Sequence, residues 1–182
     1  MTSLEGAFGL RPPSMLKRPV NRLVLVLVLL LLVGCDHASK GVAKSELETG
    51  GARELIRGLL SLRYVENTDI GFNLLRWVPE TIRFPALIVS GAVAVVALVY
   101  LLLRSSRDKT SLALPALLLI TAGAVGNYLD RIARGYVVDF VHLKHWPVFN
   151  VADVYVTTGY AILAWTLLAK RRENRALEGP PG

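Results

Sequence analysis

The sequence predicts an all-α membrane protein with four transmembrane helices and a small extracytoplasmic β-hairpin or cradle. Three observations lead to this fold class. The chain of 182 residues is 53% hydrophobic, whereas soluble domains contain about 45–50% apolar residues even when glycine is counted. Four apolar stretches approach the roughly 20 residues that a helix needs to cross a bilayer. Finally, Lys and Arg gather on one side of these stretches.

The first apolar stretch admits two interpretations. Basic residues precede an unbroken apolar run that ends in a glycine and Cys35, a pattern similar to the lipobox of a bacterial lipoprotein precursor. Alternatively, the stretch is a transmembrane helix, about residues 22–44, whose outer end carries Asp36 and Lys40. We favour the helix, because cleavage before Cys35 would remove both charged residues from their helix and disturb the orientation derived below. Cys35 is then expected to be a small packing residue.

Three further stretches predict the remaining helices. Residues 84–103 and residues 110–129 each form an uncharged run of 20 residues. The last run, 154–169, has 16 residues and becomes a full span if its helix starts near Asn150. Pro115 falls inside the third expected helix, where neighbouring helices can satisfy the freed carbonyl. We therefore expect helices at about 84–103, 111–130 and 150–169.

The distribution of basic residues predicts the orientation of the helices. Four spans place residues 1–22, 104–110 and 170–182 on one side, and these 42 residues hold 11 Lys or Arg. The other side, residues 45–83 and 130–153, holds 8 in 63. Because basic residues favour the cytoplasmic side, both termini are expected in the cytoplasm. The net charge of +7 is explained in this way without a nucleic-acid partner.

We expect a single domain over residues 1–182, with cytoplasmic tails at 1–21 and 170–182. The outer loops are 45–83 and 131–149, and the longer one is too long to be a mere connector. In it, apolar and polar residues alternate in LSLRY and again in IGFNL, on either side of a turn at Glu66–Asp69. Alternation with a period of two predicts a β-hairpin with one apolar face.

Polar and ionisable residues stand at the outer ends of the expected helices. Such residues are costly in a membrane and by default indicate function. Asp36 and Lys40 are four residues apart, so they share a helix face and can pair. The other members are Asn127, Asp130, Arg131, Asp139, Asn150 and Asp153. The topology places all of them near one plane, so the sequence predicts a cluster close to the outer surface.

Structural and functional interpretations compete for these residues. The pair of Asp36 with Lys40 is most simply structural, as is Asp130 beside Arg131. For Asp139 the structural interpretation is weaker, because a buried carboxylate needs a cation or several donors.

Asp153 raises the same question and could instead be a helix N-terminal acid that the macrodipole favours. The functional interpretation is that Asp139 and Asp153 face each other, share one proton and hydrolyse a peptide bond, as in aspartic proteases.

Other chemistry has less support. His142 and His145 have a spacing that a helical metal site could use, but there is no persuasive third ligand, so we expect no metal. The chain lacks a nucleophile elbow and a phosphate-binding glycine loop, and we expect no cofactor. A proton-coupled transporter with the same acids would need polar residues at mid-membrane, where the second and fourth spans are almost bare.

The motifs together resemble those of the lipoprotein signal peptidases (signal peptidase II). They are DHASK, GLLSLRYVENTDIGF, GAVGNYLDRIARGYVVDFVH and FNVADVYVTTG, in the same order from about residue 22 to 170. The resemblance implies an aspartic endopeptidase that removes signal peptides from prolipoproteins, cutting before the cysteine that carries a diacylglyceryl group. It implies membrane lipids and possible globomycin-type inhibitors as partners, a monomer, and an inner-membrane location. The loops 45–83 and 131–149 would be periplasmic.

The resemblance also implies roles for individual residues. Asp139, in VVDF, and Asp153, in FNxAD, match the catalytic dyad. The residues that match support or substrate-binding positions are Asp36, Lys40, Asn67, Phe72, Asn127, Asp130, Arg131 and Asn150. The stretch Thr68–Asn73 departs from the family's usual TGAAFS. This departure supports an alternative, a non-catalytic or specialised paralogue that binds prolipoprotein or an inhibitor, although the intact dyad argues against it.

Overall fold

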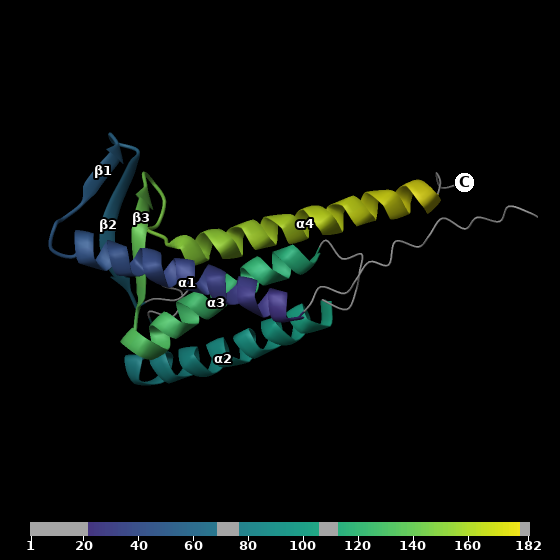
Figure 1. The fold of residues 1–182 in the computed structure, drawn as a ribbon, viewed down its shortest axis with the longest axis horizontal. Helices are drawn as coiled ribbons and strands as arrows, with labels where there is room; N and C mark the ends of the chain where they lie inside the picture. The colour runs from purple at the N-terminus through teal and green to yellow at the C-terminus, as the bar shows by residue number, and fades with distance from the viewer. Residues whose placement is uncertain (1–21, 69–76, 106–112, 179–182) are drawn as a thin grey trace, which may run out of the picture.

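Four long helices lie side by side, and a three-stranded sheet crosses one end of them (Figure 1). The computed structural model describes residues 22–68, 77–105 and 113–178. All four helices are long and apolar enough to span a bilayer. They are α1 (Arg22–Leu47), α2 (Glu80–Ser105), α3 (Ala113–Arg134) and α4 (Val151–Glu178). The predicted class, an all-α membrane protein with a small β-structure, is confirmed.

The helices extend beyond the apolar stretches from which they were predicted. α1 continues to Leu47 and α4 to Glu178, so both include polar turns past the expected ends at 44 and 169. α3 begins at Ala113, which puts Pro115 in its first turn. The N–H that proline lacks would have no intrahelical acceptor there. The carbonyl that Pro115 would free in a longer helix belongs to residue 111, which lies outside the described residues.

The sheet is antiparallel in the order β1 (Arg53–Ile56), β2 (Leu60–Asn67), β3 (Val137–Leu143). β1 and β2 form a hairpin, while β3 comes from the second outer loop and pairs with β2. The register places Val65 opposite Asp139 and Asn67 opposite Val137.

The position of the predicted hairpin was wrong. LSLRY pairs with β1 and β3, and β2 continues through Glu66 and Asn67, where we expected a turn. The proposed partner strand IGFNL lies outside the described residues. VVDFV, which we treated as loop, has the β-branched and aromatic residues that favour a strand and forms the core of β3.

α3 is the central helix and packs against α1, α2 and α4. The backbones of α3 and α4 come close together because a glycine of α4, Gly159, faces the backbone of α3. A Cβ atom on Gly159 would lie 2.7 Å from the Ala116 carbonyl oxygen and 2.6 Å from Ile120 Cγ1. Small residues at such an interface let membrane helices approach each other and gain van der Waals contact.

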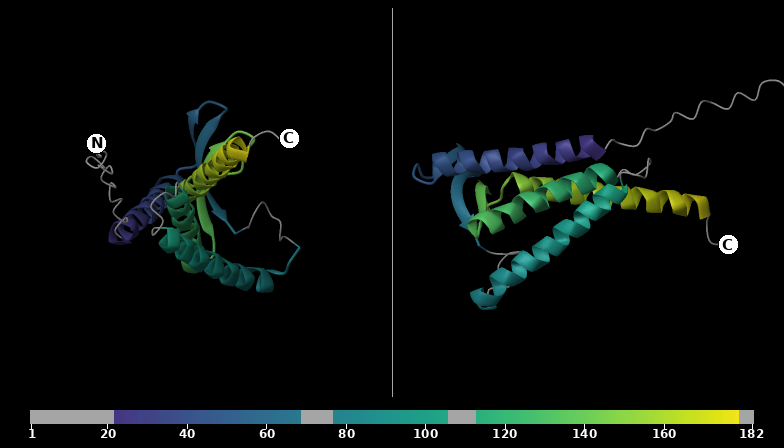
Figure 2. Two further views of the ribbon diagram at one scale, coloured as in Figure 1. Left: turned by 90° about the vertical axis from the view of Figure 1, so that its right-hand side faces the viewer. Right: turned by 60° about the horizontal axis from the view of Figure 1, so that its bottom comes forward.

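α2 diverges from α1 and α4 and meets the bundle mainly through α3 (Figure 2). Tyr128 of α3 packs over Gly91 of α2, and its hydroxyl donates to the Ile88 carbonyl at 3.1 Å. Val89, Val93 and Val96 of α2 are exposed. These apolar side chains are suited to contact the acyl chains of membrane lipids.

We predict that Gly159→Ala lowers the melting temperature of the purified protein in detergent, because the added methyl meets the α3 backbone. Overpacking of this kind costs about 1–3 kcal/mol of unfolding free energy. The matched control is Gly34→Ala, because a Cβ on Gly34 has no heavy atom within 4 Å. Equal melting temperatures for the two variants would contradict the close α3–α4 contact.

Candidate active site

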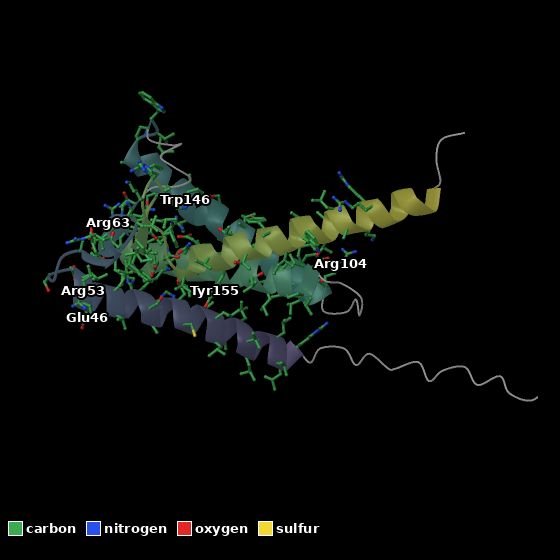
Figure 3. All side chains as sticks on the ribbon, turned by 90° about the horizontal axis from the view of Figure 1, so that it is seen from above. Glu46, Arg53, Arg63, Arg104, Trp146 and Tyr155 are labelled. Carbon is green, nitrogen blue, oxygen red and sulfur yellow. The ribbon has the colours of Figure 1, made fainter. Side chains whose placement is uncertain are left out.

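The polar residues of the predicted cluster come together where the sheet meets the helices. Side chains crowd this end of the molecule in Figure 3. Four members of the cluster are at most 1% exposed, namely Asp36, Lys40, Asp130 and Asn150. The complete set within the described residues comprises Asp36 and Lys40 of α1, Asn67 of β2, Asn127, Asp130 and Arg131 of α3, Asp139 of β3, and Asn150 and Asp153 at the start of α4.

Lys40 is the buried centre of the cluster. Its Nζ lies 2.7 Å from Asp36 Oδ2, 2.9 Å from Asp130 Oδ2 and 3.0 Å from Asn127 Oδ1. An ammonium has three N–H donors, so these three acceptors account for all of them. The expected structural pair of Asp36 and Lys40 is present. Asp130 also pairs with Lys40 and with Arg134 Nη1 at 3.1 Å.

Asp36 also joins α1 to the first turn of α4. Its Oδ1 accepts a hydrogen bond from the Ala152 backbone N–H at 2.9 Å, one of the donors that a helix N-terminus leaves without an intrahelical partner. A Cβ on Gly126 of α3 would lie 2.6 Å from Asp36 Oδ2. Glycine at position 126 therefore lets the carboxylate sit between α3 and α4.

Asn127 links Lys40 to Asp153 through two hydrogen bonds of its side-chain amide. Because the Asn127 side-chain oxygen accepts from Lys40, its amide nitrogen points the other way and donates to Asp153 Oδ1 at 2.9 Å. The Asn150 amide also donates to the same Asn127 oxygen at 3.1 Å. The orientation of the Asn127 amide is thus fixed by two donors.

Asn150 and Asp153 form a reciprocal cap at the start of α4. The Asp153 N–H donates to Asn150 Oδ1 at 3.0 Å, and the Asn150 N–H donates to Asp153 Oδ2 at 3.1 Å. This is the geometry of a capping box, in which two otherwise unpaired backbone donors are satisfied. Asp153 also lies in the first helical turn, where the macrodipole favours a negative charge.

Asp139 reaches the same group from β3. Its Oδ1 accepts from Asn150 Nδ2 at 2.6 Å and its Oδ2 from Asn67 Nδ2 at 2.8 Å. Burial raises the pKa of Asp139 to about 6; the hydrogen bond from Asn67 opposes this rise, and the negative charge of Asp153 adds to it. A carboxyl group with such a pKa can hold or release a proton near neutral pH.

Some expected residues take other roles. Arg131 Nη1 donates to the Asn127 backbone oxygen at 3.3 Å, so it supports α3 next to the cluster. Cys35 is exposed, and the expectation that it packs against the protein was wrong. Phe72 lies outside the described residues, as does the departing stretch 69–73 on which the non-catalytic alternative rests.

Sequence reasoning missed several contributors to the cluster. Arg134 follows Asp130 by four residues, a helical spacing that could have revealed the pair. His37 Nδ1 lies 3.6 Å from Asp130 Oδ1, but nothing in the sequence pointed to it. Gly126 and the Ala152 N–H act through backbone approach, which depends on how α1, α3 and α4 pack.

Comparison with known proteins identifies the family. The sequence model described as Signal peptidase (SPase) II matches residues 28–169. The chain belongs to the signal peptidase II family. The matched region covers the full cluster, the sheet and most of the four helices, so this protein is a membrane peptidase of that family.

Curated signal peptidase II relatives match over most of their length. The lipoprotein signal peptidase of Moorella thermoacetica is 36% identical, with 82% of this chain and 95% of the relative covered. That of Streptococcus pneumoniae is 32% identical, with 81% and 94% covered. A solved bacterial membrane enzyme, determined by the in meso method at 2.3 Å resolution, superposes with a TM-score of 0.68. It shares 25% identity, and 81% of this chain and 89% of that chain are covered.

We predict that Lys40→Met strongly destabilises the protein, because it leaves the Asp36 and Asp130 carboxylates buried without their shared cation. Breaking a buried ion pair in this way costs about 3–5 kcal/mol. The control is Lys44→Met, whose pair with Glu48 spans 3.9 Å between half-exposed side chains and contributes little. Thermal unfolding in detergent should separate the two variants, and equal stability would show that Lys40 does not hold the cluster.

Proposed function

We propose that this signal peptidase II removes signal peptides from diacylglyceryl-modified prolipoproteins by aspartic chemistry at Asp139 and Asp153. The observation that carries the proposal is that Asn150 contacts both carboxyl groups. Its side-chain amide donates to Asp139 at 2.6 Å and its backbone N–H donates to Asp153 at 3.1 Å. A single residue thereby fixes the two acids relative to each other, as a shared-proton dyad requires.

The surroundings of the two acids favour different protonation states. Asp153 accepts from two N–H donors at the positive end of α4, and both features stabilise a carboxylate. Asp139 is 3% exposed, and its direct donors are the neutral amides of Asn67 and Asn150. Since two close carboxylates do not ionise together readily, we assign the shared proton to Asp139.

The proposed reaction follows from this assignment. Asp153 takes a proton from a water molecule whose oxygen attacks the scissile carbonyl carbon, while Asp139 protonates the carbonyl oxygen. The resulting tetrahedral species collapses as the C–N bond breaks. Asp139 recovers its proton, and Asp153 passes its own to the leaving amine. The products are a signal peptide with a new carboxyl end and a protein whose first residue is the lipidated cysteine.

The location of the cluster suits a substrate that comes from the membrane. Asp153, Asn67 and Asn127 are partly exposed, so Asp153 can be reached from outside the protein. Exposed apolar side chains, such as Ile132 of α3 and Val154 of α4, lie nearby in the sequence. We place this end of the molecule at the periplasmic face of the inner membrane, with both termini in the cytoplasm, because Lys and Arg concentrate at the opposite end. The enzyme acts as a monomer, and globomycin-type inhibitors occupy the same site.

We predict that Asp139→Asn and Asp153→Asn each abolish cleavage of a diacylglyceryl-modified prolipoprotein in vitro. Asparagine preserves the shape of each side chain but can neither take up nor supply the proton. The control is Glu54→Gln, a matched change on an exposed residue of β1, and it should leave the rate unchanged. Circular dichroism and thermal unfolding establish that each variant is folded. Full activity in either aspartate variant would overturn the mechanism.

The assignment of the proton to Asp139 predicts a pH dependence of the cleavage rate. Activity requires protonated Asp139, so the loss of this proton sets the alkaline limb of kcat/KM. Asn67→Leu removes a donor that stabilises the Asp139 carboxylate, so the pKa of Asp139 rises and the alkaline limb moves to higher pH. An alkaline limb that stayed in place or moved to lower pH in Asn67→Leu would contradict this assignment.

A further inference from the structure

A second polar feature lies at the end of the bundle opposite the sheet. A cavity of about 480 Å³ is lined by Arg22, Tyr100, Leu103 and Arg104. It lies between the first turn of α1 and the last turns of α2. In Figure 3, Arg104 stands at the end of the helices far from the sheet. The cavity is therefore separate from the aspartate cluster.

The cavity has cationic walls without a counter-charge from the described part of the chain. The side chains of Arg22 and Arg104 are exposed. Neither guanidinium pairs with an acidic side chain of residues 22–68, 77–79, 81–105 or 113–172, whose side chains the structure describes. None of the described residues that line the cavity is acidic. Two like charges around one cavity favour an anion between them.

The residues around the cavity form an environment that suits a lipid headgroup. Arg22 and Arg104 are at the ends of two membrane-spanning helices. Within the next two turns toward the membrane interior, these helices expose apolar side chains that include Leu23, Leu27 and Leu101. An anion that fits must therefore be charged at one end and apolar at the other. Basic pockets between helices on the cytoplasmic side suit anionic phospholipids.

We propose that the α1–α2 cavity binds one anionic phospholipid, with its phosphate between Arg22 and Arg104 and its acyl chains along the exposed faces of the two helices. Guanidinium groups bind phosphate oxygens through paired N–H donors, and the Tyr100 hydroxyl can add a donor to the headgroup. α1 and α2 share no extensive direct contact, since each packs mainly on α3. The lipid would fill the space between them and stabilise the bundle.

The test uses the purified full-length protein, delipidated in detergent, with phosphatidylglycerol as the probe. Native mass spectrometry counts retained lipid, and thermal unfolding reports stabilisation. Phosphatidylcholine of the same acyl chains tests the need for net negative charge, and glycerol phosphate tests the need for the acyl chains. We expect one tightly retained phosphatidylglycerol, a higher melting temperature with it, and neither effect with the other two probes.

Arg22→Gln combined with Arg104→Gln should weaken phosphatidylglycerol binding at least tenfold and remove the thermal shift. The matched control, Lys170→Gln with Arg171→Gln, removes two exposed charges near the corresponding end of α4 and should bind as the wild type does. Arg104→Gln alone, with a partial loss, serves if the double variant is unstable. Unchanged binding in the arginine variants, or equal binding of phosphatidylcholine, would overturn the proposal. None of these measurements depends on cleavage.

Discussion

The buried ammonium of Lys40 is the interaction on which the rest of the site depends. Removing three ionised groups from water costs several kcal/mol for each ion, and the arrangement is tolerable only because every Lys40 donor has an acceptor. Asp36, Asp130 and Asn127 supply these acceptors from α1 and α3. The charge therefore fixes how two membrane helices meet. It also explains why the polar residues lie at the helix ends, where Arg134 can pair with Asp130 and the α4 N-terminus can donate to Asp36.

Neutral side-chain amides connect Lys40 to the two acids, Asp139 and Asp153. Asn127 turns its donor toward Asp153 because Lys40 occupies its oxygen, and Asn150 holds Asp153 by its backbone and Asp139 by its side chain. Amides suit this task because they orient a carboxyl group without neutralising it. The two acids can then differ in proton affinity through burial and helix position, as aspartic chemistry at neutral pH requires.

The sequence predicted the four helices and the membership of the cluster well, because both follow from local signals. Long apolar stretches indicate the transmembrane helices. Charged residues at the ends of these helices are rare enough to indicate a polar cluster. The strand β3 was missed because VVDFV lies in a short loop segment and is mostly apolar. It therefore lacks the alternation of apolar and polar residues that indicates a strand. The exact partners of Asp130 were also missed. They depend on the side of α3 that faces α1, which is decided by close contacts at Gly126 and Gly159 and not by spacing alone.

The central claim is that Asp139 holds the single proton of the dyad. Infrared difference spectroscopy during a pH titration measures this directly, because a protonated carboxyl group has a C=O stretching band that a carboxylate lacks. With ¹³C-labelled aspartate, the account predicts an aspartic acid band that titrates near the pKa of Asp139, about 6. The band should be absent in Asp139→Asn. In Asp153→Asn it should titrate at lower pH, because the charge that raises this pKa is gone. A band that persists unchanged in Asp139→Asn would contradict the account.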